Sequence, residues 1–488
     1  MIDLYNIDKE TSLFVASKMG HTQIVKFLLE HKCNPDLCNK NHQSPLYIAS
    51  WEGYTEIVKL LLEHKCNPDL CNEDNQSPLY VASWRGHSEI VKLLLEQKCN
   101  PDLCNKDNQS PLYVASKGGH TEIVKLLLEQ KCNPDLCNKD NQSPLYVASK
   151  GGHTEIVKLL LEHKCNPDLC NKYNESPLYV ASMEGHTVIV KLLLEQKCNP
   201  DLCNKYNESP LYVASVEGHL EVVKLLLEQK CNPDLCNKYS ESPLYVASMK
   251  GHTEMVKLLL EQKCNPDLCN KDNESHLYVA SKGGHTEVVK LLLEHKGNPD
   301  LCNKYIWSPL FVASMKGHTE IVKLLLEHKC NPDLCNEDNQ SPLYVASDFG
   351  HTEIVELLLE HKCNPDLCNK DNLSPLYVAS FRGHNKIVKL LLEHKCNPAL
   401  CNKNNQSPLY VASEFGHTEI VELLLEHKCN PDLCNKNNQS PLYVASEFGH
   451  NKIVKLLLEH KCNPDLCNKD NQSPLYVASE GGHTEIVE

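Results

Sequence analysis

The sequence predicts an all-α solenoid, a stack of helix-turn-helix units that forms one array over residues 1–488. The chain repeats every 33 residues, since the hexad Cys33-Asn-Pro-Asp-Leu-Cys38 returns from Cys66 and at each further step to Cys462. Each repeat holds two short helical patterns, and turn-forming residues join consecutive repeats. Periods of roughly 20–50 residues are typical of arrays whose units bury their apolar faces only against neighbours.

The first helix of a repeat follows Ser44, which can accept a hydrogen bond from a free amide at the helix start. Pro45 then takes the first helical position, where the missing N–H is not needed, and Gly53 ends the helix. Counting this serine to Ser473, with Thr11 in the first repeat, gives fifteen repeats. The first covers about residues 1–32, the others begin every 33 residues from 33, and the last, 462–488, is incomplete.

The second helix is predicted over residues 55–63, because Ile57, Leu60 and Leu61 form an apolar stripe at helical spacing. We expect Thr55 to be its N-cap, because Ser and Asn replace it in other repeats and are also good caps.

These motifs resemble the ankyrin repeat. Ser-Pro-Leu-Tyr-Val-Ala stands where that family has Thr-Pro-Leu-His-x-Ala, and Gly119 to Glu129 is similar to its second helix. The resemblance covers the whole chain and implies an ankyrin solenoid of about fifteen helix-turn-helix units with short β-hairpin turns. Tyr47 replaces the family's histidine, and Lys65 replaces a glycine after the second helix, so we expect a positive φ at Lys65. Asn41 and His42 stand where the hairpin tip usually has Asp-Gly.

Composition excludes several classes of protein. Apolar residues make up 41% of the chain, enough for a packed core. The longest apolar runs have four residues, and a membrane span needs about 20. The first residues carry no secretory signal. With 64 acidic and 49 basic residues the formal charge is −15, which disfavours nucleic acid. We therefore expect no nucleic-acid partner, no membrane insertion and a cytoplasmic, reducing location.

The 27 cysteines all follow the repeat, thirteen at the Cys33 position, where Gly297 is the exception, and fourteen at the Cys38 position. If the step between them is extended, the two sulfurs lie about 16 Å apart, too far for a disulfide. In the ankyrin-like unit Cys33 aligns with a small buried residue, so we favour a structural thiol. A redox-sensitive or metal-binding thiol array stays open as an alternative.

Histidine also follows the repeat. Of 25 histidines, fourteen follow the glycine between the helices and nine follow the second helix, which leaves His42 and His276. A residue that recurs in almost every repeat is a fold residue, because a catalytic histidine occurs once beside a positioned partner. No phosphate loop, metalloprotease helix or nucleophile elbow is present. We therefore expect that the chain is not an enzyme, has no catalytic residue, and binds no metal, cofactor or small-molecule substrate.

Differences between repeats concentrate at the hairpin tips and at the end of the first helix. In the ankyrin family these positions line the concave groove that binds proteins. Large apolar side chains occur there, and such groups are typical interface anchors. The predicted partner-binding residues are Trp51, Trp84, Tyr173, Met183, Tyr206, Val216, Tyr239, Met249, Tyr305, Trp307, Met315, Phe349, Phe381, Phe415 and Phe448. We expect the strongest contact patch in 173–315, although recent copying of repeats would also explain this pattern.

In the later second helices, charges alternate between repeats. Glu353 and Glu356 are followed by Lys386 and Lys389, and the alternation continues to Glu488, which predicts a ladder of opposite charges. The sequence stops inside a second helix, from which we expect either a fragment of a longer chain or a truncated gene model.

We therefore expect a non-catalytic scaffold that binds other proteins. The main alternative is the targeting region of a larger kinase, ubiquitin-ligase adaptor, death-domain or channel protein.

Overall fold

The computed structural model describes residues 4–488 as helices joined by turns, and the first three residues of the predicted array lie outside the described residues. The chain divides into two compact parts, residues 1–238 and 239–488, here the N-terminal and C-terminal parts. The assignment of the whole chain to one array stays a prediction. Within residues 4–488 the only β pairings are two isolated bridges, Tyr5–Thr11 and Cys269–Ser275, so the expected hairpins are tight turns without strands.

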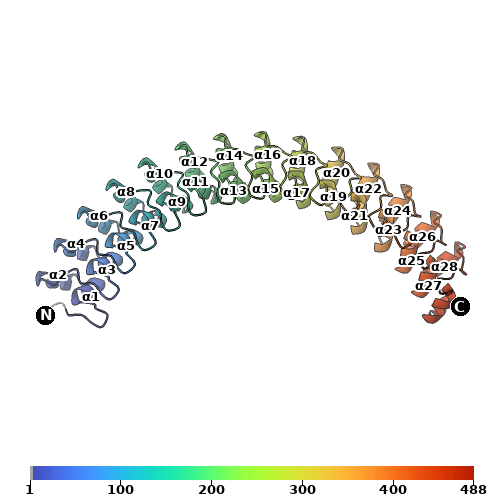
Figure 1. Ribbon diagram of the computed structural model, residues 1–488, viewed down its shortest axis with the longest axis horizontal. Coiled ribbons are helices and arrows are strands. Elements are labelled where there is room, and N and C mark those ends of the chain that lie inside the picture. Colours follow the sequence, from blue (N-terminus) through green and yellow to red (C-terminus); the bar gives the residue numbers. More distant parts are fainter. Residues whose placement is uncertain (1–3) are drawn as a thin grey trace. The chain divides into compact units, whose positions relative to one another are not determined.

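Each repeat contributes two helices, an odd-numbered first helix and an even-numbered second helix (Figure 1). Within each part, first helices pack on first helices and second helices on second helices, in two layers. The N-terminal part contains α1 (Ser12–Lys18), α2 (Thr22–Glu30), α3 (Pro45–Glu52), α4 (Thr55–Glu63), α5 (Pro78–Arg85), α6 (Ser88–Glu96), α7 (Pro111–Gly118), α8 (Thr121–Glu129), α9 (Pro144–Lys150), α10 (Thr154–Glu162), α11 (Pro177–Met183), α12 (Thr187–Glu195), α13 (Pro210–Glu217) and α14 (Leu220–Glu228).

The C-terminal part continues the same alternation of first and second helices. It contains α15 (Pro243–Lys250), α16 (Thr253–Glu261), α17 (His276–Gly283), α18 (Thr286–Glu294), α19 (Pro309–Lys316), α20 (Thr319–Glu327), α21 (Pro342–Phe349), α22 (Thr352–Glu360), α23 (Pro375–Arg382), α24 (Asn385–Glu393), α25 (Pro408–Glu414), α26 (Thr418–Glu426), α27 (Pro441–Glu447), α28 (Asn451–Glu459), α29 (Pro474–Glu480) and α30 (Thr484–Val487).

The start of the first helix is as expected. In α23 the Ser374 hydroxyl accepts a hydrogen bond from the amide of Tyr377, and Pro375 takes the first helical position. Gly383 ends the helix with φ +79°, in the left-handed region that glycine enters without strain. The first-helix signals in the sequence are thus confirmed.

The expected cap of the second helix is wrong. Thr55 is the first helical residue of α4, and the N-cap position belongs to Tyr54, which makes no side-chain capping bond. The amide of Thr55 instead donates to the carbonyl oxygen of Gly53 (3.1 Å). The predicted bounds of this helix, residues 55–63, are confirmed, and the tight turn at Gly53 places the N-cap at residue 54.

The second helix ends in a Schellman motif. In α24 the amide of Cys396 donates to the carbonyl of Leu391 (3.2 Å) and that of Lys395 to Leu392 (3.0 Å). The expected positive φ is present, since Lys65 has φ 59° and Lys395 has φ 60°. This conformation is unfavourable for a residue with a Cβ atom, and it recurs in fourteen repeats.

Glycine at this position is expected to stabilise the protein. Lys395→Gly should raise the free energy of unfolding of its repeat by about 1 kcal/mol, because the exposed lysine gives up a strained backbone. Hydrogen exchange of the α24 amides measures the change. Lys389→Gly, at an exposed position inside the same helix, is the control and should destabilise by about 1 kcal/mol. Equal effects of the two substitutions would contradict the assignment of strain to Lys395.

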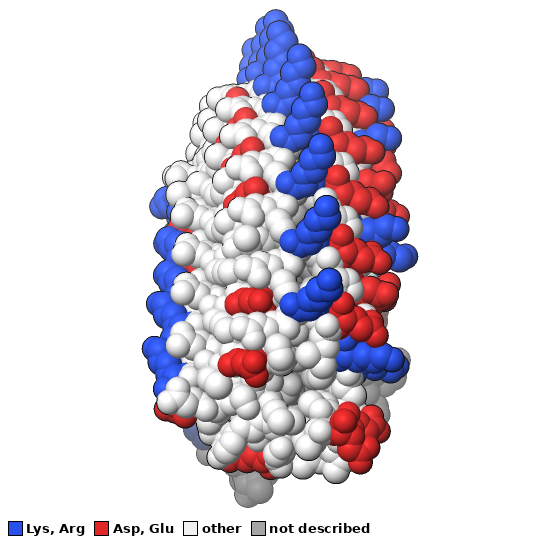
Figure 2. Space-filling model, turned by 90° about the vertical axis from the view of Figure 1, so that its right-hand side faces the viewer, with Lys and Arg blue, Asp and Glu red and all other residues white. Residues whose placement is uncertain are grey.

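Exposed charges recur at fixed repeat positions and form columns on the surface, with basic side chains beside acidic ones (Figure 2). The expected ladder of ion pairs is nevertheless wrong. Among the ion pairs of residues 4–488, none joins Glu353, Glu356 or their counterparts to the lysines of an adjacent repeat. Glu419 instead accepts a hydrogen bond from the amide side chain of Asn385, which begins the neighbouring second helix. The lysines are exposed, and ion pairs at such positions contribute little.

Candidate protein-binding surface

The hairpin tips are shaped by an asparagine in each repeat. Asn402 Oδ1 accepts hydrogen bonds from the amides of Asn404 (2.8 Å) and Gln406 (3.0 Å), which fold the tip around one side chain. Each tip also bonds to the tip before it, as the Lys403 amide does to the Asp371 carbonyl (3.1 Å). Within each part the tips thus form a hydrogen-bonded row, whose outward side chains are held at fixed intervals.

The tyrosine that replaces the family's histidine ties the first helix to the next hairpin. Tyr47 Oη donates to Gln76 Oε1 (3.0 Å) and accepts from Asn72 Nδ2 (3.1 Å), both in the following repeat. Where glutamate replaces this glutamine, Tyr146 Oη donates to Glu175 (2.8 Å). Burial and the Glu175 carboxylate raise the pKa of Tyr146, so the hydroxyl keeps its proton and remains a donor. The surface between tips and first helices is therefore firmly anchored.

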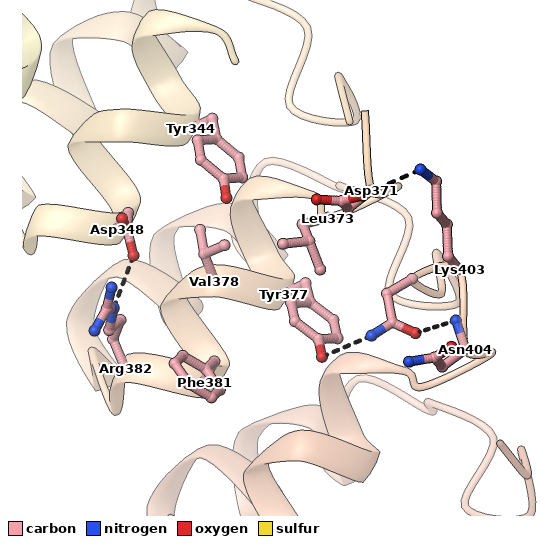
Figure 3. A pocket seen from close by; sticks show the side chains of 11 residues that line it. Tyr344, Asp348, Asp371, Leu373, Tyr377, Val378, Phe381, Arg382, Lys403 and Asn404 are labelled. Atoms are coloured by element: carbon pink, nitrogen blue, oxygen red, sulfur yellow. Dashed lines mark hydrogen bonds and ion pairs between the residues drawn. The ribbon is translucent and has the colours of Figure 1, made fainter. Parts of the chain in front are cut away.

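A pocket of about 530 Å³ opens on this surface in the C-terminal part (Figure 3). Leu373, Tyr377, Val378 and Phe381 form much of its wall. An equivalent pocket of about 430 Å³ lies beside Trp84 in the N-terminal part. The same place between consecutive repeats can thus receive a side chain in both parts.

Ion pairs border the pocket of Figure 3. Arg382 Nε donates to Asp348 (2.8 Å), and Lys403 Nζ donates to Asp371 (3.1 Å). The pocket is therefore apolar in its middle and polar at its edges, as ligand sites on proteins usually are.

The fifteen predicted partner-binding residues differ in exposure. Ten have large exposed areas: Trp84, Tyr173, Tyr206, Tyr239, Met249, Tyr305, Phe349, Phe381, Phe415 and Phe448. The other five are half-buried: Trp51, Met183, Val216, Trp307 and Met315. Trp307 and Met315 pack against the buried first-helix side chains of the C-terminal part, so they offer a partner only part of their surface.

In the N-terminal part the structure brings several of these residues together. The rings of Trp51 and Trp84 meet edge to face with centroids 5.3 Å apart, and the Arg85 guanidinium lies 5.2 Å from the Trp51 ring. Further along, Lys205 Nζ lies 4.1 Å from the Tyr173 ring centre, where it makes a cation–π contact. The predicted residues thus form two clusters in this part.

In the C-terminal part the closest aromatic pair is Phe381 and Phe415, whose rings meet edge to face at 4.8 Å. Tyr305 lies 6.3 Å from Trp307. Phe349 is adjacent to the histidine of its own repeat, His351, at 6.3 Å. Phe381 and Phe415 therefore form an exposed aromatic pair that joins two consecutive repeats of this part.

A family model described as "Ankyrin repeats (3 copies)" matches the chain over residues 2–74, 64–136, 79–169, 163–235, 229–303, 296–369, 353–433 and 424–488. The chain belongs to the ankyrin repeat family. Ankyrin repeats are generally protein-interaction modules and are typically non-catalytic. No curated protein matches the sequence. Among residues 4–488, no helix combines the length and the apolar character needed to cross a bilayer.

Some residues of this ankyrin surface were not predicted from the sequence. Leu373 lines the pocket of Figure 3, at a position where most repeats carry glutamine or glutamate. The apolar residue at a position that is otherwise polar could have identified Leu373 as a candidate surface residue. Arg382 and Asp348 were also missed, because their ion pair joins different positions of adjacent ankyrin repeats.

The cysteines of these ankyrin repeats are thiols, one set buried and one half-buried. The step between the sets is not extended as expected, because Pro35 and Asp36 form a turn and the Cys38 thiol lies 3.5 Å from the Asp36 carbonyl oxygen. Burial raises the pKa of Cys66 to about 12, and burial with the Asp36 carboxylate raises that of Cys38. Thiols with raised pKa values are poor nucleophiles, which disfavours the redox alternative.

The recurrent histidines have structural roles. His87 Nε2 lies 3.2 Å from the carbonyl oxygen of Trp51 in the preceding repeat, so it connects repeats. His64 Nδ1 lies 2.9 Å from the Leu60 carbonyl oxygen at the end of its own helix. Within residues 4–488, no three His, Cys, Asp or Glu side chains are placed to hold a metal ion.

Proposed function

We propose that the chain is a non-catalytic scaffold that binds other proteins through the surface of hairpin tips and first-helix ends. The observation that carries the proposal is the run of exposed aromatic side chains on this anchored surface, above all Phe381, Phe415 and Phe448. Exposed apolar groups held on a rigid support are what a protein interface needs, because little conformational entropy is lost on binding.

We also propose a reducing location and a second contact patch for this scaffold. The free thiols support a reducing compartment such as the cytoplasm, where cysteines stay reduced. The patch predicted over residues 173–315 provides further candidate contacts, Tyr173 and Tyr206 in the N-terminal part and Tyr239 and Met249 in the C-terminal part. Alanine at Tyr206, Tyr239 and Met249 tests that patch, and unchanged capture of every partner would remove it.

The main test is the triple variant Phe381→Ala, Phe415→Ala and Phe448→Ala. We expect it to lose at least about tenfold in affinity for partners captured by the wild-type chain, because interface aromatics dominate binding energy. Cross-linking with mass spectrometry identifies the partners, and titration with each purified partner gives the affinity. Val188→Ala, an exposed apolar position on the second helix α12, is the control and should change nothing. Equal capture by the triple variant and this control would contradict the proposal.

A further inference from the structure

The strip formed by Phe381, Phe415 and Phe448 lies at the ends of three consecutive first helices in the C-terminal part. These side chains are 37%, 49% and 53% exposed, a large apolar area for a protein surface. Phe381 also lines the pocket of Figure 3, so the strip continues into a cavity that can receive a bulky side chain.

A row of carboxylates accompanies this strip. Glu414 and Glu447 directly precede Phe415 and Phe448, and Glu480 occupies the same position in the next repeat. Within residues 4–488, none of the three forms an ion pair. At the equivalent position two repeats earlier, Asp348 is neutralised by Arg382. The row therefore presents negative charge that the chain itself leaves uncompensated.

The surroundings of Glu414 and Glu447 disfavour the charged form of these carboxylates. Partial burial and the charge of Glu447 raise the pKa of Glu414, and partial burial and Glu480 do the same for Glu447. Glu414 and Glu447 are thus less well solvated than free carboxylates, and each is repelled by the carboxylate of the next repeat. A positive group placed beside the row would offset both effects, because its attraction favours the charged form of the carboxylates.

We propose that the strip and its carboxylates bind a cationic segment of a partner protein, with arginine or lysine at regular intervals and bulky apolar residues between. The inference rests on the proposed function and names the chemistry of the partner. Charge complementarity selects the basic residues, which face Glu414, Glu447 and Glu480, while the apolar residues cover the phenylalanines and enter the pocket. Lys436 and Lys469 carry positive charge at the hairpin tips, so the attraction is confined to the helix-end side and orients the segment.

The repeat sets the spacing of the basic residues. Packed helices lie about 8–10 Å apart, so the carboxylates of adjacent repeats recur at about that interval. A polyproline II segment advances about 3.1 Å per residue and returns to the same face after three residues. Arginine at every third position of such a segment therefore meets one carboxylate per repeat.

The experiment measures binding of a fluorescent synthetic peptide, four copies of the tripeptide Arg-Leu-Pro, to the full chain by anisotropy. We expect the double variant Glu414→Gln and Glu447→Gln to weaken binding by roughly tenfold. The control, Glu426→Gln and Glu459→Gln, removes the same charge from exposed second-helix ends and should leave the affinity unchanged. Raising salt from about 0.1 to 1 M should weaken wild-type binding and leave the Glu414 and Glu447 variant less affected.

Three outcomes of the peptide experiment would overturn the inference. The inference is overturned if the wild-type chain does not bind the arginine peptide, or if both double variants bind it equally. It is also overturned if a peptide with glutamate in place of arginine binds as well. The triple phenylalanine variant separates the two proposals. If that variant loses its protein partners while the Glu414 and Glu447 variant keeps them, the scaffold function stands and the cationic partner fails.

Discussion

Acidification from pH 7 to pH 5 is expected to destabilise the ninth repeat selectively, because of one buried histidine. His276 occupies the first position of α17, where thirteen other repeats carry proline, and it is 0% exposed. Its Nδ1 lies 2.6 Å from the Pro266 carbonyl oxygen, and its Nε2 lies 2.9 Å from the Ser242 hydroxyl. The ring also meets Tyr245 edge to face.

The lowered pKa of His276 determines the direction in which stability changes with pH. Burial lowers the pKa of His276 from 6.5 to about 4, although the Pro266 carbonyl and the Asp267 carboxylate oppose the shift. Between these values the unfolded chain binds a proton that the folded chain does not. Stability is therefore fully present above pH 6.5 and is lost as the pH falls towards 4. At pH 5 the loss amounts to about 2 kcal/mol.

The variant His276→Pro provides the matched control, since proline is the residue of thirteen other repeats. Hydrogen exchange of α15 to α18 at both pH values, in both proteins, gives the local free energy of opening. We expect the wild type to lose protection in this region at pH 5 and the variant to lose much less. The same loss in both proteins would show that another group controls the acid response.

A second large effect is expected from Gly350→Ala. Gly350 has φ +79°, and a Cβ atom there would lie 2.8 Å from Cε1 of His384 in the next repeat. The alanine must hold a left-handed backbone, which costs about 1 kcal/mol, and must displace a ring bonded to the Asp348 carbonyl (3.2 Å). We expect a total loss of about 2–3 kcal/mol, measured as the free energy of opening of α21 and α22 by hydrogen exchange.

Two comparisons isolate the contribution of the ring. Gly482 has φ +71° and nothing within 4 Å of its Cβ position, so Gly482→Ala should lose only the backbone part. In the background of His384→Ala, the Gly350→Ala substitution should likewise lose only that part. Additive effects of the substitutions at Gly350 and His384 would refute steric coupling between them.

The sequence predicts well those features that depend on neighbouring residues. Ser44, Pro45 and Gly53 act within one turn of helix, and their roles are those expected. The positive φ of Lys65 was also predictable, because the end of a helix requires it. In contrast, the expected cap at Thr55 was wrong, because after the turn at Gly53 Thr55 is already helical and Tyr54 takes the N-cap position.

Contacts between repeats were harder to predict. The hydrogen bonds of Tyr47 reach residues 25 and 29 positions away, and only the folded chain brings these side chains together. His276 could be recognised as an odd histidine, but its burial depends on the packing of neighbouring helices. The charge ladder failed for a related reason, since similar sequence positions do not ensure that long exposed side chains meet. For the candidate surface, the sequence identified exposed aromatics such as Phe415 but missed Leu373.

The row of hairpin tips has a consequence for how such a gene can change length. The Lys403 amide bonds to Asp371 and that of Lys436 to Asn404, the same step of one repeat each time. When recombination adds or deletes a whole repeat in frame, the two repeats that become neighbours can therefore form the same hydrogen bond between their hairpin tips. Selection can vary the number of modules without first having to design a new junction.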